Sequence, residues 1–130
     1  MTENELLSLA KKARENSYSP YSGFAVGAAL LTSDGRVFLG TNLENASYSL
    51  TLCAERAGFA AAITAGARDF SMLAVVGGKA GEATEFCPPC GACLQVLSEF
   101  CPADFPVALE RDGAPAVLPL SALLPITFNL

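Results

Sequence analysis

The 130-residue sequence contains no histidine and no tryptophan, and its eight lysines and arginines are outnumbered by thirteen acidic residues. The net charge of −5 and the scattering of the basic residues argue against a nucleic-acid partner, because polyanions are bound by a concentrated basic surface. No apolar run reaches the roughly 18–20 residues that cross a bilayer. We therefore expect neither nucleic acid nor membrane among the partners of this chain.

The length suits one domain over residues 1–130, since a chain of this size can bury most of a core by itself. The first residues, MTENELLSLAKKARENS, lack the basic-then-apolar layout of a secretory signal. A cytoplasmic location, where thiols stay reduced, is the resulting expectation. The five cysteines, an odd number without the spacing of a disulfide framework, then indicate metal ligands or redox groups.

Hydrophobic periodicity and turn residues predict alternating helices and strands. The helical segments are 2–15, 53–65, 91–100 and a last turn at 121–124. The strands are 24–31, 36–44, 72–78 and a short pair within 105–120 around Asp112-Gly113. This order predicts an α/β fold in which a mixed sheet is covered by helices on both faces.

Four of the five cysteines fall in two short segments, 51–62 and 86–96. Cys90 and Cys93 have the Cys-x-x-Cys spacing that places two sulfurs near one point, and Cys53 begins another helix from which it could supply a third. Helix N-termini stabilise thiolates, and Arg56 could add positive charge. Three protein ligands leave one position on zinc for water, as in catalytic sites. Glu55 could take a proton from that water and hand it on.

Other interpretations of the cysteines stay open at this point. Cys87-Pro88-Pro89-Cys90 is a second, overlapping Cys-x-x-Cys, and a fourth ligand from Cys87 would close the site and make it structural. A redox dithiol or ordinary buried thiols would also explain the pattern. None of these alternatives gives Glu55 a role.

The sequence CAER at 53–56, combined with PCGAC at 89–93, resembles the zinc-dependent cytidine deaminases, specifically their short, homotetrameric, three-cysteine class. Nearly the whole chain takes part. The matching blocks, in order, are YSPYSGFAVGAALL (18–31), GTNLENASYSL (40–50), CAERAGFAA (53–61), PCGACLQVLSEF (89–100) and LLPITF (123–128). The absence of histidine fits only the all-thiolate type. The resemblance implies a three-layer α/β/α cytidine deaminase-like fold with a mixed five-stranded sheet.

The resemblance also implies the cofactor and the chemistry. One Zn²⁺ per chain is held by Cys53, Cys90 and Cys93, and Glu55 is the proton shuttle. In the implied mechanism, zinc-bound hydroxide attacks C4 of cytidine or 2′-deoxycytidine while Glu55 protonates N3 and then the departing ammonia. The products are uridine or 2′-deoxyuridine, as in pyrimidine salvage. Arg56 balances charge beside the thiolates.

The resemblance also implies which residues bind the substrate. Asn42 and Glu44 match the family's ribose-binding pair, whose amide and carboxylate suit sugar hydroxyls. Phe24 matches an aromatic residue of the base pocket, and Ala54 a source of backbone hydrogen bonds to the base. The lack of an arginine cluster favours a free nucleoside over a nucleotide or polymer.

The resemblance predicts a homotetramer with shared active sites. Phe128 matches a C-terminal aromatic that closes the site of a neighbouring subunit, and Tyr48 matches a residue near the subunit junction. The sequence departs from the family at Leu94, where an arginine is common, and at Cys87, near a usual serine. The rival hypotheses are a deaminase of modified cytosine nucleosides such as blasticidin S, and a non-catalytic zinc or thiol-redox module.

Overall fold

Five strands form one sheet in the order β2-β1-β3-β4-β5 in the computed structural model, which describes all residues from 1 to 130. The strands are β1 Phe24–Thr32, β2 Val37–Thr41, β3 Phe70–Lys79, β4 Pro106–Arg111 and β5 Ala114–Pro119. Only β3 and β4 are parallel, and the other neighbouring pairs are antiparallel. The prediction of a mixed five-stranded sheet is confirmed.

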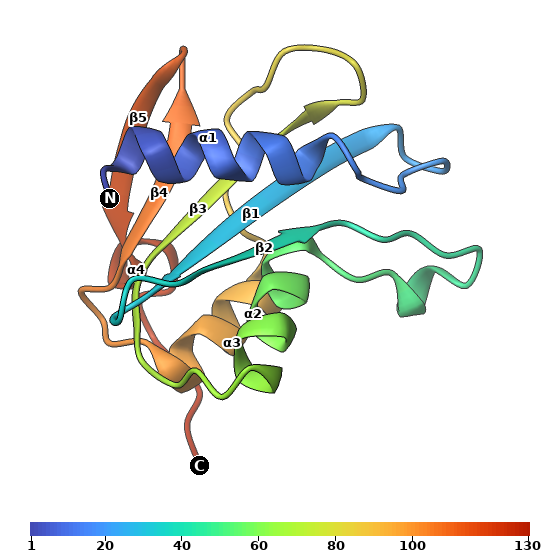
Figure 1. Cartoon of the computed structure of the whole chain (residues 1–130). Helices are drawn as coiled ribbons and strands as arrows, with labels where there is room; N and C mark the ends of the chain where they lie inside the picture. The colour runs from blue at the N-terminus through green and yellow to red at the C-terminus, as the bar shows by residue number, and fades with distance from the viewer.

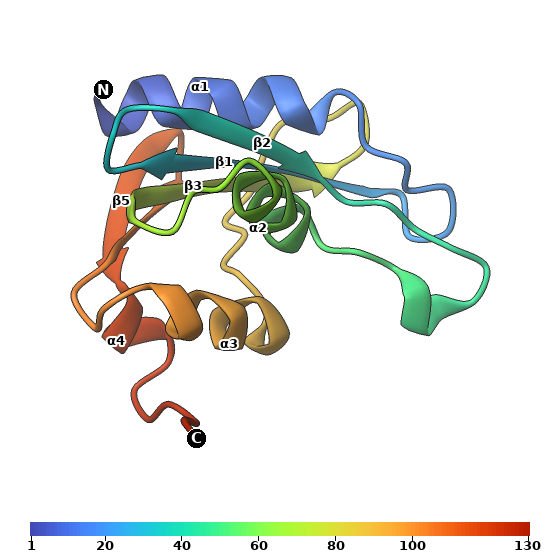
Figure 2. The ribbon, with the colours of Figure 1, turned by 60° about the horizontal axis from the view of Figure 1, so that its bottom comes forward.

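Helices cover both faces of this sheet, as predicted (Figures 1 and 2). The helices are α1 Glu3–Arg14, α2 Ala54–Thr64, α3 Gly91–Phe100 and the short α4 Leu120–Leu123. Helix α1 lies alone on one face, and α2 and α3 lie on the other (Figure 2). None of these helices is both long and apolar enough to span a bilayer.

Helix α1 is fixed at its start and along its buried side. The Thr2 hydroxyl accepts from the Glu5 N–H at 3.2 Å, and the Glu5 carboxylate accepts from the Thr2 N–H at 2.8 Å, which completes a capping box. Leu6, Leu7, Ala10 and Ala13 then face the sheet. The helix approaches β1 so closely that a Cβ atom on Gly27 would lie 1.9 Å from the Ala10 carbonyl oxygen.

Helix α2 makes a matching close approach on the opposite face. A Cβ atom on Gly40 of β2 would lie 2.1 Å from the Ala54 carbonyl oxygen and 2.5 Å from the Gly58 nitrogen. The absence of a side chain at Gly40 therefore allows the first turn of α2 to rest on the sheet. The larger of the two core clusters fills this face, with Phe59, Leu97 and Phe105 among its buried side chains.

Strand β2 is shorter than the predicted 36–44, because it ends at Thr41. The Asn42 side chain accepts the Val26 N–H at 2.9 Å, so a side chain replaces the backbone of β2 at the next ladder position. Residues 42–52 then leave the sheet as an arm that carries the unpredicted 3₁₀ turn η1, Tyr48–Leu50 (Figure 1). Leu43 and Leu52 pair across the base of this arm.

Candidate active site

Three cysteine sulfurs meet where α2 and α3 begin. Cys53 is the N-cap residue of α2, Cys90 is the N-cap residue of α3, and Cys93 lies in the first turn of α3. Neither N-cap thiol bonds to its own helix, so both sulfurs point to the space between the helices. The Sγ atoms of Cys53 and Cys90 are 3.9 Å apart, and those of Cys90 and Cys93 are 3.6 Å apart.

This cluster has the dimensions of a zinc site. A tetrahedral zinc with Zn–S bonds of about 2.3 Å separates its sulfurs by about 3.8 Å, close to the spacing observed. All three sulfurs lie within 4.8 Å of one another, and Cys87 is not part of the group. The Cys87 sulfur packs instead toward Gly77, where an added Cβ atom would lie 2.6 Å from it. The structure therefore shows a three-sulfur cluster and not a closed four-cysteine site.

The surroundings of the sulfurs favour negative charge. The pKa of Cys53 is lowered to about 5, mainly by a hydrogen bond with Cys93. Arg56 lowers it further, whereas burial acts to raise it. The Arg56 Nη2 atom donates to the Cys53 sulfur at 3.3 Å. The pKa of Cys93 is raised by the hydrogen bond with Cys53 and by burial. The cluster thus holds a thiolate at neutral pH, the form that binds metal.

Glu55 follows Cys53 in the first turn of α2 and is only 4% exposed. Burial raises the pKa of its carboxyl group, the interaction with Cys93 opposes this, and the Cys53 charge adds to the rise. A carboxyl group whose pKa is raised toward neutrality can both accept and return a proton. Glu55 therefore has the properties of an acid/base group next to a metal site.

Glu55, Cys53 and Cys90 line a cavity of about 220 Å³. Its walls are Val26, Asn42, Thr51, Leu52, Cys53, Ala54, Glu55, Cys87, Pro88 and Cys90.

 A neighbouring cavity measures about 350 Å³. The smaller cavity brings together five of the predicted site residues: Asn42, Cys53, Ala54, Glu55 and Cys90.

The other five wall residues were not predicted as part of the site. Val26 lies two positions after Phe24 in β1, and alternate residues of a strand face the same side. The predicted role of Phe24 in the base pocket could therefore have indicated Val26 as well. Thr51 and Leu52 directly precede Cys53, and Cys87 and Pro88 precede Cys90. Their closeness in sequence to the sulfur ligands is the signal that identifies them.

Glu44 and Tyr48 line the neighbouring cavity together with Tyr21, Ser22 and Thr51. Thr51 belongs to both cavities, so the two adjoin. The Glu44 carboxylate accepts the N–H groups of Tyr21 and Ser22 at 2.9 and 3.1 Å and the Ser22 hydroxyl as well. The hydrogen bond from the Ser22 hydroxyl is the main reason that the pKa of Glu44 is lowered.

Asn42 is buried and already holds the backbone around it. Its Oδ1 accepts from the Ser17 hydroxyl at 2.5 Å and from the Val26 N–H at 2.9 Å, and its Nδ2 donates to the Phe24 carbonyl at 2.8 Å. One N–H of the Asn42 amide is left for a further partner. Asn42 therefore shapes the cavity in addition to facing it.

Two predicted aromatic residues do not line the small cavity. The Phe24 ring lies over Gly77, where an added Cβ atom would be 3.0 Å from the ring. Phe128 is 68% exposed in the tail beyond α4, and its carbonyl accepts from Gln95 at 3.1 Å. The tail extends below α3 and away from the arm that carries Tyr48 (Figure 2). Within one chain, Phe128 therefore lies outside the small cavity.

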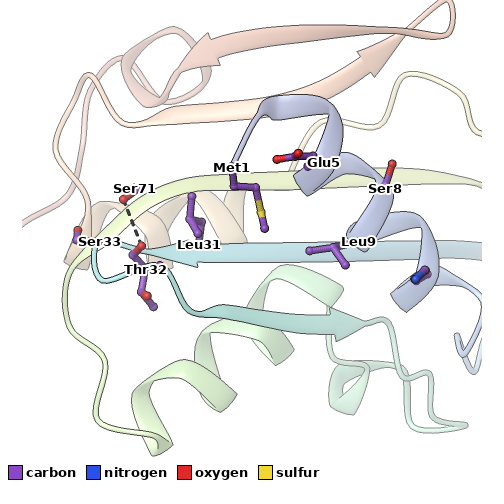
Figure 3. A pocket seen from close by; sticks show the side chains of 10 residues that line it. Met1, Glu5, Ser8, Leu9, Leu31, Thr32, Ser33 and Ser71 are labelled. Atoms are coloured by element: carbon purple, nitrogen blue, oxygen red, sulfur yellow. Dashed lines mark hydrogen bonds between the residues drawn. The ribbon is translucent and has the colours of Figure 1, made fainter.

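The largest hollow, of about 750 Å³, lies between α1 and the start of the β1–β2 turn (Figure 3). Met1, Leu9 and Leu31 form its apolar part, and the charged residues on its wall, Glu5 and Lys12, are exposed. No cysteine lines it. It has volume but no convergent chemical groups, whereas the small cavity is lined by a buried carboxyl group and two cysteines of the three-sulfur cluster.

A three-thiolate cluster with room for another ligand is the type of metal site found in metal-dependent hydrolases. Residues 1–109 match the family described as the cytidine and deoxycytidylate deaminase zinc-binding region. The chain therefore belongs to the cytidine and deoxycytidylate deaminase family of zinc-binding enzymes. Its cofactor is zinc, one ion per chain.

Individual relatives agree with this assignment along nearly the full length. A cytidine deaminase of Sporosarcina psychrophila is 45% identical over 99% of this chain and 93% of its own, and one of Halalkalibacterium halodurans is 47% identical over 99% and 96%. The crystal structure of cytidine deaminase from Burkholderia pseudomallei superimposes with a TM-score of 0.89 at 46% identity, covering 98% of this chain and 100% of that one. The Mycobacterium tuberculosis enzyme gives 0.83 at 41% identity, covering 100% and 99%.

Proposed function

We propose that this chain, acting as one domain over residues 1–130, hydrolyses cytidine and 2′-deoxycytidine to uridine and 2′-deoxyuridine with release of ammonia. The observation that carries the proposal is the three-sulfur cluster, two of whose cysteines line one small cavity together with the buried Glu55 carboxyl group. The relatives named as cytidine deaminases support the choice of substrate.

Zinc held by Cys53, Cys90 and Cys93 would lower the pKa of a water molecule at its remaining position from 15.7 to about 7. Glu55 would accept the proton that this water loses and deliver it to N3 of the pyrimidine as the water oxygen bonds to C4. Glu55 would then pass the remaining proton of that oxygen to the amino group as the C4–N bond breaks. One C–O bond replaces one C–N bond, and no oxidation or reduction is involved.

Arg56 and the helix N-termini keep the sulfurs ionised while this occurs. The Arg56 guanidinium faces the Cys53 sulfur, and its buried Nε atom has no partner of its own. Leu94, where the family commonly has an arginine, is 6% exposed and belongs to the apolar core. Arg56 is thus the cation through which this chain balances the charge of the cluster.

The two adjoining cavities divide the substrate between them in this proposal. The base occupies the cavity of about 220 Å³, against the Ala54 backbone, and the ribose extends past Thr51 toward Glu44. The free N–H of Asn42 and the remaining acceptor positions of Glu44 bind ribose hydroxyls. Phe24 supports the base pocket from behind, through Gly77 and Cys87.

A homotetramer with shared active sites completes the proposal. Tyr48 on the arm is 73% exposed, and the tail residues Ile126 and Phe128 are 89% and 68% exposed. A tail that does not line its own cavity is suited to cover the cavity of a neighbouring copy. Light scattering that finds an active monomer would contradict the shared site.

The walls of the small cavity contain no arginine or lysine, which supports a free nucleoside rather than a nucleotide as substrate. A role in pyrimidine salvage in the cytoplasm follows from such a substrate. The same cavity gives no support to a bulkier modified nucleoside, and turnover of blasticidin S measured beside cytidine tests this directly.

The decisive experiment is a spectrophotometric cytidine assay on the wild type and on Glu55→Gln, with zinc measured in both. We expect one zinc per chain in each protein and a fall in kcat of about 10²–10⁴-fold in the variant, the usual contribution of an acid/base group. A zinc-loaded wild type that releases no ammonia from cytidine would overturn the proposal.

A further inference from the structure

The segment that delivers Cys90 to the metal cluster passes from one face of the sheet to the other. A Cβ atom on Gly78 would lie 2.7 Å from the Ala83 carbonyl oxygen, whereas one on the preceding Gly77 would meet the Cys87 sulfur. Since neighbouring strand residues point to opposite faces, the chain crosses between residues 83 and 87. Figure 2 shows this segment rising beside the end of α1 and then descending to α3.

Three contacts tie the middle of this segment to β3 and β4. The Glu85 N–H donates to the Gly77 carbonyl at 2.8 Å. The Thr84 hydroxyl donates to Oε1 of Glu110, near the end of β4. Arg111, the next residue of β4, stacks over the partly exposed Phe86 ring, with its guanidinium carbon 4.1 Å from the ring centre.

Glu110 is the buried member of this set. It is 9% exposed, and its two carboxylate oxygens serve different parts of the fold. Oε1 accepts from Thr84 in the crossing segment, whereas Oε2 is 2.6 Å from the Lys11 ammonium group of α1. The carboxylate thus joins α1, β4 and the segment that leads to Cys90.

We propose that Glu110, through Thr84, is a positioning residue for the zinc site, an inference that rests on the proposed function of that site. Thr84 is fixed on the α1 face, six residues before Cys90, and the chain between them contains two successive prolines, Pro88 and Pro89. Because proline restricts the backbone, the two prolines limit how much of a displacement at Thr84 is absorbed before Cys90.

The two partners of Glu110 allow its positioning role to be separated from its contribution to stability. Thr84→Val removes the hydroxyl group from the crossing segment at nearly constant volume, and Thr84→Ser retains it. Lys11→Met removes the ion pair to α1 and leaves the bond from Thr84 in place. The measurement is the rate at which the zinc-loaded protein transfers its metal to a coloured chelator, together with the thermal unfolding midpoint.

We expect Thr84→Val to release zinc roughly tenfold faster, since a hydrogen bond to a charged acceptor is worth about a decade or more in an equilibrium constant. Thr84→Ser restores the wild-type rate, and Lys11→Met lowers the unfolding midpoint without changing zinc release. The positioning role is wrong if Thr84→Val and Lys11→Met change the release rate equally or not at all. A wild type that holds zinc but does not deaminate cytidine contradicts the proposed function and leaves this test intact.

Discussion

The two faces of the sheet use the beginnings of their helices in different ways. On one face, the start of α1 is closed by the Thr2–Glu5 capping box, so the side chains there bond to the helix itself. On the other face, α2 and α3 begin at Cys53 and Cys90, whose side chains make no capping bond. Their sulfurs are left free to meet a common ligand.

The larger cavity is not on the face that carries the sulfur cluster. The largest hollow, of about 750 Å³, lies against α1, and the cavity at the sulfur cluster is about 220 Å³. The uncapped helix starts concentrate positive dipole ends, thiolates and a buried carboxyl group in a small volume. Convergence of chemical groups, and not volume, therefore identifies the candidate site.

The strongest test of this comparison is to remove a free N-cap sulfur. Cys90→Ser should lose zinc and cytidine turnover below detection, because two remaining thiolates cannot hold the ion in a catalytic geometry. Zinc content and ammonia release measure the effect. Cys101→Ser is the matched control, since Cys101 is buried in the core outside the cluster and its loss should leave zinc in place. Retention of zinc by Cys90→Ser would show that the cluster is not the metal site.

The second test compares the two close helix contacts. An added Cβ atom clashes with α2 at Gly40 and with α1 at Gly27, so alanine at either position should cost about 1–3 kcal/mol of unfolding free energy. Only Gly40→Ala displaces the first turn of α2, and so only it should also speed zinc release. Urea unfolding and metal transfer to a chelator report the two effects.

Gly58→Ala provides the control for this pair. A Cβ atom on Gly58 would lie 3.6 Å from the Phe38 carbonyl oxygen, an ordinary contact, so the change should stabilise α2 by up to about 1 kcal/mol through helix propensity. Faster zinc release from Gly27→Ala as well would mean that the two faces are not independent.

The site was more predictable from the sequence than its surroundings were. The ligand spacing and the adjacent Glu55 depend on local helix starts, which short sequence segments encode. The early end of β2 depends on the Asn42 side chain reaching across to Val26, and the separation of Cys87 from the cluster depends on its packing toward Gly77. Both are contacts between distant parts of the chain, which periodicity and spacing do not report.

A weaker effect is expected where the helix start is used for stability alone. Thr2→Ala removes the hydroxyl that accepts the Glu5 N–H and should cost about 1 kcal/mol of unfolding free energy. Zinc content and cytidine turnover should stay at wild-type values, in contrast to Cys90→Ser. Urea unfolding beside the two functional assays checks this, and a loss of zinc from Thr2→Ala would break the comparison between the faces.

The smallest effect concerns the Lys11–Glu110 ion pair on the α1 face. Burial acts to raise the pKa of Glu110, but the bonds from Lys11 and Thr84 outweigh it and hold the pKa below its ordinary value of 4.5. A carboxyl group whose pKa is lower in the folded state stabilises the fold above its unfolded pKa, and this contribution is lost as the pH falls through the folded value.

Lys11→Met should therefore lower the free energy of unfolding by less than about 1 kcal/mol at pH 7, because the lysine is half-exposed. The difference between wild type and variant should shrink once the pH falls below 4.5 and toward the folded pKa, where Glu110 becomes protonated in both proteins. Urea unfolding at pH 7 and at about pH 3.5 measures it, and loss of zinc in acid affects both proteins alike. A difference that stays constant with pH would assign the effect of Lys11 to its packing on α1 instead of its charge.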